Sequence, residues 1–288
     1  MERGKSISIG YNYILVPGTE DNNTFSRNID QWTTLEVATF IHLADSFALQ
    51  SIYPQLENIA MVIDRCRECI ADGGRVIYAG AGTSGRIAVQ DVAELKPTYG
   101  LGKETFDYII AGGDEAIRRS VEGAEDSGEA ASRALEEKRF GSKDALIGIT
   151  ASGSTPYVIG ALNYARSVGG LSISITNNKD KPVKAVSDIC LEILTGPEVI
   201  QGSTRMKAGT AQKMILNIIS TGIVIKLGYT YKNTMMKMES WYNEKLKLRA
   251  RKMLIQEFHI TDGEAKALLE EHSYRIDDAF RHLSKSKK

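Results

Sequence analysis

Five short apolar runs alternate with helix-like segments along the middle of this chain, and this alternation limits the possible folds more than any other feature. The runs are Arg75–Ala79, Tyr108–Ala111, Ala145–Thr150, Leu171–Thr176 and Ile189–Leu194. The segments between them, which read as helices or turns, are roughly Ser84–Leu95, Glu115–Lys138, Pro156–Ser167 and Lys181–Val186. Continuously apolar strands joined by such crossovers predict an α/β fold, a doubly wound five-stranded parallel sheet with helices on both faces.

Helices are also expected on both sides of this central region. Thr33-Thr34-Leu-Glu36 resembles a capping box that opens a helix reaching about Gln50, and a second helix follows from about Tyr53 to Ala71. Beyond the fifth strand, a helix from Ala208 to about Leu227 is apolar almost all round, which is typical of a buried helix.

The C-terminal part reads as a small helical module. Residues 233–257 are expected to form one amphipathic helix, and two shorter helices follow, for which Asp262 and either Ser273 or Asp277 are candidate caps. We therefore divide the chain into an N-terminal arm and helix (1–52), a central domain (53–232) and a C-terminal helical module (233–288).

Two hydroxyl-rich loops follow the first and third apolar runs. They are Ala79-Gly-Ala-Gly-Thr-Ser-Gly-Arg86 and Thr150-Ala-Ser-Gly-Ser-Thr-Pro156. A strand that turns through Gly, Ser and Thr into a helix leaves backbone N–H groups and hydroxyls directed at one place, where the helix N-terminus adds partial positive charge. Because both loops lie at carboxyl ends of parallel strands, where ligands of such sheets bind, they predict a phosphorylated, hydroxyl-rich ligand.

The first loop also matches the dinucleotide-binding pattern G-x-G-x-x-G through Gly80, Gly82 and Gly85. That pattern needs an acidic residue at the end of the next strand, about 20 residues on, to bind a ribose. Here the next strand ends in Ala111-Gly-Gly113, and Asp114 falls beyond it. A nicotinamide or flavin site is therefore disfavoured, although a tight turn without a ligand remains an alternative for either loop.

Composition excludes several classes of partner. The 288 residues contain 36 Lys and Arg and 36 Asp and Glu, so no net charge draws the chain to nucleic acid or to a membrane surface. The sequence shows no membrane-length apolar run and no signal peptide, and three cysteines do not suggest a disulfide framework, so we expect a cytoplasmic protein.

Neither the cysteines nor the histidines predict a metal site. Cys66 and Cys69 form a C-x-x-C near the end of a predicted helix, with no second pair nearby to complete a zinc site. We interpret them as helix side chains, and we expect the four histidines to be structural or solvated. They are His42, His259, His272 and His282.

Three sequence blocks together resemble a known family. Gly80-x-Gly-Thr-Ser-Gly85, Ala151-Ser-Gly-x-Thr-Pro156 and Gly202-Ser-Thr-Arg-Met-Lys-Ala-Gly-Thr-Ala-Gln-Lys213 resemble the sugar isomerase (SIS) domain and, more narrowly, the bacterial N-acetylmuramic acid 6-phosphate etherases. The resemblance extends from Asn22 to about Phe280. The tail is similar to the ubiquitin-associated-like module that ends these etherases, and the central domain is the expected phosphosugar-binding SIS domain.

This resemblance implies a reaction without a cofactor. Members of the family cleave the D-lactyl ether of N-acetylmuramic acid 6-phosphate with water, by elimination and hydration, during cell-wall amino sugar recycling. The family's catalytic pair matches Glu94, as the acid that protonates the leaving oxygen, and Glu125, as the base that removes the C2 proton. Two carboxylates with separated pKa values suffice for such chemistry.

The two hydroxyl-rich loops and, by resemblance, the block around Glu198 give the residues expected to hold the sugar phosphate. Expected ligand-binding residues are Thr83, Ser84, Ser152, Ser154, Thr155, Glu198, Ser203 and Lys207. Arg205 or Lys207 could either pair with Glu198 or contact the ligand. Glu94 lies far along its helix from the first loop, so we expect a homodimer in which the second subunit could supply one carboxylate.

Ser154 departs from the family pattern, which usually has Arg at this place. An Arg there would offer a bidentate contact to an anion such as the lactyl carboxylate, and Ser offers none. Two alternative functions therefore stay open: a sugar-phosphate aldose–ketose isomerase, which shares the C2 proton abstraction, and a non-catalytic sugar-phosphate sensor like the related glucokinase regulatory protein.

Overall fold

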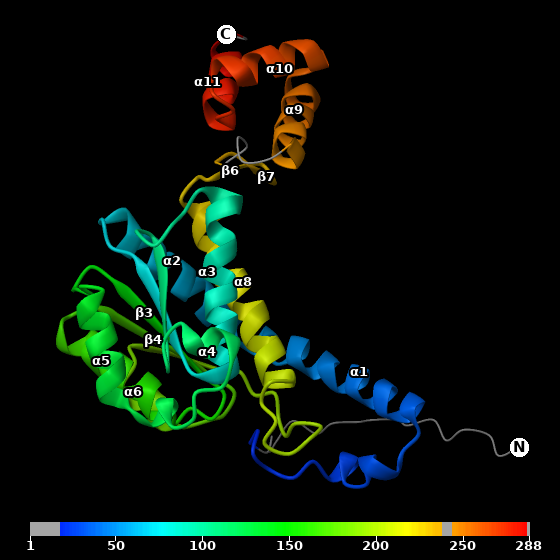
Figure 1. The fold of residues 1–288 in the computed structure, drawn as a ribbon, viewed down its shortest axis with the longest axis vertical. Coiled ribbons are helices and arrows are strands. Elements are labelled where there is room, and N and C mark those ends of the chain that lie inside the picture. The colour runs from blue at the N-terminus through cyan, green and yellow to red at the C-terminus, as the bar shows by residue number, and fades with distance from the viewer. Residues whose placement is uncertain (1–17, 238–243, 287–288) are drawn as a thin grey trace, which may run out of the picture.

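The computed structural model describes residues 18–237 and 244–286. Its centre is a five-stranded parallel sheet in the order β2-β1-β3-β4-β5 (Figure 1). The strands are β1 (Val76–Gly80), β2 (Phe106–Ile110), β3 (Ala145–Thr150), β4 (Leu171–Thr176) and β5 (Ile189–Glu192). The predicted α/β class and parallel sheet are confirmed, and the predicted strand ends agree to within two residues.

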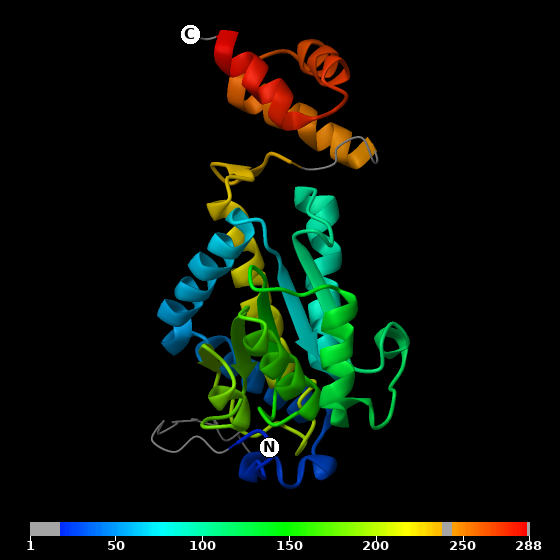
Figure 2. The same ribbon diagram turned by 90° about the vertical axis from the view of Figure 1, so that its left-hand side faces the viewer.

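Helices cover both faces of the sheet, as its continuously buried strands require. One hydrophobic core joins the sheet to α2 (Leu56–Ala71), α3 (Gly82–Tyr99) and α8 (Lys207–Lys226). A second core joins the opposite face to α5 (Gly128–Glu137) and α6 (Pro156–Ser167), and the short α7 (Pro182–Ala185) precedes β5. Figure 2 shows the two helical layers on either side of the strands.

The segment Glu115–Lys138, expected to be helix-like or turn-like, is broken into three short pieces. They are α4 (Glu115–Arg118), the 3-10 turn η4 (Ala124–Asp126) and α5. Gly123 has a left-handed φ of 71°, and the Ser127 side chain accepts a hydrogen bond from the N–H of Ala130, which caps α5. Glu125 therefore lies in a loop between two helices.

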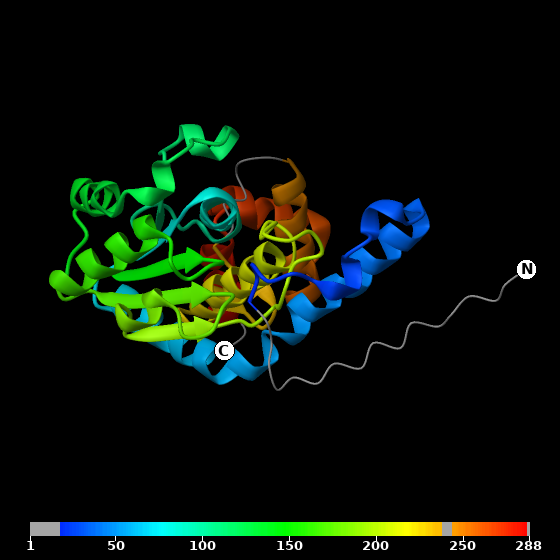
Figure 3. The same cartoon turned by 90° about the horizontal axis from the view of Figure 1, so that it is seen from below.

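At the N-terminal side, α1 (Thr34–Gln50) projects away from the sheet (Figures 1 and 3). Thr33 and Glu36 form the predicted capping box. The helix buries only Phe40, Ala44 and Ala48. The turns η1 (Thr24–Ser26) and η2 (Ile29–Gln31) precede it, and η3 (Tyr53–Gln55) replaces the first turn of the predicted second helix.

The prediction of one helix over residues 233–257 is wrong at its start. An antiparallel hairpin, β6 (Thr230–Tyr231) and β7 (Thr234–Met235), occupies this place, because Lys232 adopts a left-handed φ of 52° and reverses the chain. Residues 238–243 lie outside the described part, and α9 (Glu244–Phe258) follows. Then come α10 (Asp262–Glu271), whose cap is Thr261 rather than Asp262, and α11 (Ile276–Ser286).

These last three helices share a hydrophobic core of their own and lie beyond one end of the sheet domain (Figure 1). The longest apolar helix of the described part, α8, has a mean hydropathy of 1.2 over its most apolar window, enough by length and composition to cross a membrane. However, 56% of that window is buried against the rest of the fold, as for a central core helix.

Candidate functional site

The two hydroxyl-rich loops meet at the carboxyl ends of β1 and β3, which are neighbouring strands. Together they line a cavity of about 270 Å³. Among the predicted ligand-binding residues, this cavity is lined by Thr83, Ser84, Ser152 and Thr155, and the predicted base Glu125 lines it too. The structure thus brings five of the predicted site residues into one place.

The first loop leads directly into α3, and its glycines allow close packing there. A Cβ atom on Gly85 would lie 2.6 Å from a side-chain carbon of Ile110 and 2.9 Å from the carbonyl oxygen of Gly80. The N-cap residue of α3 is Ala81, and no side chain of the described residues caps the helix. The N–H groups of the first turn therefore remain available for an anion.

Ser84 has a further contact within the fold. Its hydroxyl donates to the side-chain oxygen of Gln212 at 2.8 Å, and Gln212 in turn donates to Asn177 at 2.8 Å. This chain of buried hydrogen bonds ties the start of α3 to α8 and to the end of β4.

The second loop is held by its own hydroxyls. Thr150 Oγ1 lies 2.8 Å from Thr155 Oγ1 and accepts a hydrogen bond from the N–H of Gly153. Ser154 is exposed and does not line the cavity, and its hydroxyl donates to Ser152 Oγ at 3.2 Å. Ser154 therefore lies at the rim of this site.

Glu94 lies elsewhere. It lines a separate, small cavity of about 80 Å³ between α3 and α8, together with Asp91 and Lys213. Glu94 follows Thr83 by eleven positions along α3, a rise of about 16 Å. Within this chain the two predicted catalytic carboxylates thus line different cavities.

Asp91, which the sequence analysis missed, is the best-connected group of the Glu94 cavity. Its carboxylate accepts hydrogen bonds from Tyr78 Oη and Ser220 Oγ, both at 3.2 Å. Burial raises the pKa of Asp91, and the hydrogen bonds from Ser220 and Tyr78 and the charge of Lys213 oppose that rise. Asp91 precedes Glu94 by three residues and so lies on the same face of the helix, and this spacing is the sequence signal that could have identified it.

Three predicted ligand-binding residues, Glu198, Ser203 and Lys207, do not line the 270 Å³ cavity. Glu198 is fully buried and accepts hydrogen bonds from the N–H groups of Lys207 (3.0 Å) and Ala208 (2.9 Å) at the start of α8. The Lys207 ammonium donates to the carbonyl of Thr195 at 2.9 Å. Burial raises the pKa of Glu198 and lowers that of Lys207.

These contacts show that Glu198 and Lys207 hold the loop that precedes α8. From that loop it is Thr204 that lines the cavity, and Glu20 of the N-terminal arm joins it. Sequence analysis missed both, because the arm shows no periodicity that would place it at the carboxyl edge of the sheet. Figure 3 shows the arm and this loop meeting at that edge.

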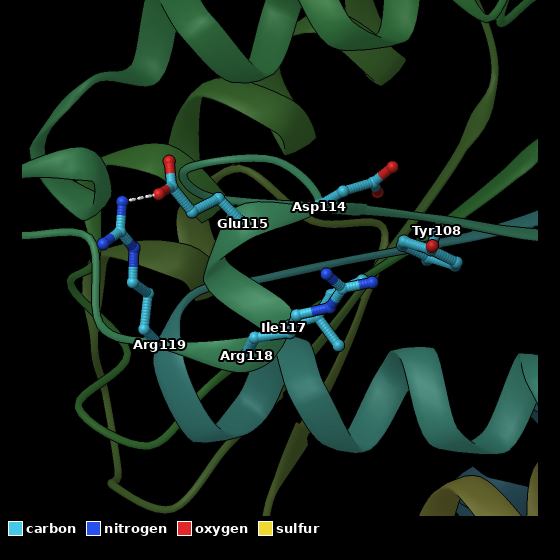
Figure 4. A pocket seen from close by; sticks show the side chains of 6 residues that line it. All are labelled: Tyr108, Asp114, Glu115, Ile117, Arg118 and Arg119. Atoms are coloured by element: carbon cyan, nitrogen blue, oxygen red, sulfur yellow. Dashed lines mark hydrogen bonds and ion pairs between the residues drawn. The ribbon is translucent and has the colours of Figure 1, made fainter.

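A larger cavity, of about 600 Å³, lies at the edge strand β2 and contains none of the predicted site residues. Tyr108, Asp114, Arg118 and the ion pair Glu115–Arg119 line it (Figure 4). No residue of the two hydroxyl-rich loops that converge between β1 and β3 lines it. We therefore assign the candidate site to the smaller cavity.

The cysteine interpretation agrees with the structure. Cys66 is buried in the core on α2, where burial raises the pKa of its thiol well above the usual range, and Cys69 is half-buried. A thiol in such surroundings is unreactive.

Comparison with known proteins identifies the same regions. Residues 58–166 match the model of the glucokinase regulatory protein N-terminal SIS domain, and residues 126–221 match that of the SIS domain. Among solved structures, a Listeria monocytogenes protein assigned to the sugar-phosphate isomerases superposes with a TM-score of 0.51 at 16% identity, over 69% of this chain and 94% of that one. A structure from E. coli gives a TM-score of 0.50 at 17% identity, over 70% of this chain and 97% of that one.

Curated relatives are much closer in sequence. The N-acetylmuramic acid 6-phosphate etherase of Clostridium beijerinckii is 45% identical over 94% of this chain and 89% of the relative. N-acetylmuramic acid 6-phosphate etherase 1 of Enterococcus faecalis is 44% identical over 88% of this chain and 84% of the relative. Such identity along nearly the whole length, on an SIS sheet with both hydroxyl-rich loops in place, shows that the chain belongs to the N-acetylmuramic acid 6-phosphate etherase family.

Proposed function

We propose that this protein cleaves the D-lactyl ether at C3 of N-acetylmuramic acid 6-phosphate, with net addition of water, and so acts as a carbon–oxygen lyase. The products are D-lactate and N-acetylglucosamine 6-phosphate. The observation that carries the proposal is the cavity between β1 and β3, where two hydroxyl-rich loops and Glu125 converge. Its volume of about 270 Å³ suits a sugar phosphate, at the lower end of ligand pockets.

The phosphate of the substrate binds at the uncapped start of α3, where N–H groups and the hydroxyls of Thr83, Ser152 and Thr155 are close together. Glu125 faces the same cavity from η4 and acts as the base. It takes the C2 proton, which the C1 aldehyde of the open-chain sugar makes acidic. The base that takes the C2 proton and the groups that bind the phosphate therefore lie in the same cavity.

Glu94 acts as the acid in this proposal. As the C3–O bond breaks, its proton goes to the ether oxygen, so that lactate leaves and a C2–C3 double bond remains. Water then adds at C3 and a proton returns to C2, which gives N-acetylglucosamine 6-phosphate. Carboxyl groups alone supply these proton transfers, so we expect no cofactor.

The separation of Glu94 from Glu125 supports a homodimeric site. In one subunit the two carboxylates line different cavities, and α1 projects with large apolar side chains uncovered: Leu35 is 76% exposed and Leu49 is 60% exposed. A second subunit that covers such surface could bring its own Glu94 to the first subunit's sugar. We expect this dimer to work in the cytoplasm.

Lys213 can provide the positive charge for the lactyl carboxylate that Ser154 does not offer. Lys213 lines the Glu94 cavity, and among the described residues its ammonium forms no ion pair within 4.0 Å. In the substrate the lactyl carboxylate is close to the ether oxygen that Glu94 protonates, so a cation beside Glu94 is in the right place to bind it. We assign this role to Lys213, in the absence of an Arg in the second loop.

The direct test is incubation with N-acetylmuramic acid 6-phosphate and an enzymatic assay of D-lactate. The wild-type protein should release lactate, whereas Glu94→Gln and Glu125→Gln should lose at least about 100-fold in turnover and still bind the sugar phosphate. C2 proton exchange without lactate release would indicate an isomerase. Unchanged ligand binding with no reaction of any kind, in all three proteins, would indicate a sensor.

A further inference from the structure

Two histidines and a glutamate of the C-terminal module lie together at the turn between α10 and α11. Glu271 is the last residue of α10, His272 follows it as the C-cap, and His282 lies on α11. One ligand atom from each of the three residues lies within 4.8 Å of the others. Sequence spacing did not reveal this group, because the separation of the two histidines matches no common metal motif.

The two rings already have a spacing suited to a shared ion. Nε2 of His272 and Nδ1 of His282 share a hydrogen bond of 3.1 Å, in which either nitrogen can be the donor. In a tetrahedral zinc site, bonds of about 2.0–2.1 Å place two nitrogen ligands about 3.3 Å apart. The rings meet edge to face, with 78° between their planes, so they are not stacked, and a zinc ion that replaced the proton shared by the two nitrogens would be bound by both rings.

Backbone geometry fixes this approach. Ser273 and Tyr274 both adopt left-handed φ angles, 52° and 58°, which residues other than glycine rarely adopt. The turn is closed by hydrogen bonds from the N–H of Tyr274 to the carbonyl of Leu269 and from the N–H of Arg275 to that of His272. Such a turn costs conformational energy. It reverses the chain between α10 and α11, so that the His272 ring lies beside the His282 ring of α11.

The surroundings suit a metal that crosslinks two helices. Glu271 is exposed, so its carboxylate is free to rotate toward the nitrogens, and solvent can supply a fourth ligand. The module has a core of nine buried residues, and a domain of this small size gains stability from a bound ion that joins its helices. We propose that Glu271, His272 and His282 bind one zinc ion, which joins α10 to α11.

The experiment is a calorimetric titration of Zn²⁺ into metal-free, full-length protein. We expect one ion per chain, with a dissociation constant below about 100 µM and a rise in the melting temperature of the module. His272→Gln and His282→Gln should each weaken binding at least about tenfold. In the wild type, Co²⁺ in place of Zn²⁺ should give the visible absorption of a tetrahedral site.

His259→Asn is the matched control, since His259 is an exposed histidine of the same module outside the cluster, and Asn tolerates its left-handed φ of 56°. This variant should bind zinc as the wild type does. The proposal is overturned if no saturable event with one ion per chain occurs, or if the His272 and His282 variants bind as tightly as the wild type. Circular dichroism identifies a variant that has lost its fold, in which case the Co²⁺ spectrum of the wild type decides.

Discussion

Lys213 is the residue at which recognition of the lactyl group can be measured. Lys213→Met removes the charge and keeps most of the side-chain length, so kcat/KM for lactate release should fall about 10- to 100-fold. Exchange of the C2 proton of N-acetylglucosamine 6-phosphate in heavy water involves no lactyl group and should fall much less. Lys226→Met, at the far end of α8, is the control. An equal loss in both reactions would show that Lys213 only supports Asp91.

For Glu198 we predict an effect on the free energy of unfolding rather than on ligand binding. Its carboxylate accepts two N–H groups at the start of α8, and Glu198→Gln would place an amide N–H₂ against one of them. We expect a loss of about 1–3 kcal/mol in the free energy of unfolding, measured by urea titration. Glu122→Gln, on an exposed loop, should change little.

The contribution of Glu198 to the free energy of unfolding depends on pH in a defined direction. Because burial raises the pKa of Glu198, the native state holds the proton more tightly than the unfolded state. The contribution of this group to stability is therefore full below the ordinary glutamate pKa and is lost as the pH rises through the raised value. Glu198→Gln should remove that part of the pH dependence, and an unchanged pH profile would contradict the assignment.

Among the structural elements, the junction of β1 and α3 depends on a glycine. Gly85→Ala would place a methyl group 2.9 Å from the carbonyl oxygen of Gly80, a backbone atom that cannot move aside. The free energy of unfolding should drop by about 1–3 kcal/mol. In Gly263→Ala on α10 the added methyl group meets no atom of the described residues within 4 Å, so this change should raise stability by up to about 1 kcal/mol. Thermal unfolding of both variants gives the comparison, and equal shifts would refute this reading of Gly85.

Elements were predictable where one local signal dominates. α6 begins at Pro156 and ends at Ser167 as its sequence predicts, because proline suits the first helical turn. α3 was expected to end at Leu95, before Pro97, yet it continues to Tyr99, since Gly100 with a left-handed φ of 71° caps it. The capping glycine, not the proline, sets that end.

At the scale of the whole molecule, the sequence predicts the sheet and the meeting of its two loops, because carboxyl ends of neighbouring parallel strands share an edge. It also predicts from helix length that Glu94 lies far from the first loop, but it does not predict that Glu20 and Thr204 line the cavity of that loop. The positions of Glu20 and Thr204 depend on how the N-terminal arm and the loop before α8 pack over long sequence distances. The hydrophobic periodicity of a sequence gives no information about contacts between segments so far apart.

The projecting α1 supplies the test of the whole assembly. If a partner subunit covers it, charges placed on its uncovered leucines should block association, since buried unpaired carboxylates are costly. Leu35→Glu combined with Leu49→Glu should convert a dimer into a monomer in light scattering and lower lactate release at least about tenfold. Leu248→Glu on α9, a leucine that is 45% exposed in the C-terminal module, should leave both unchanged. A wild-type monomer with full activity would contradict the shared site, because one subunit would then bring Glu94 to the sugar unaided.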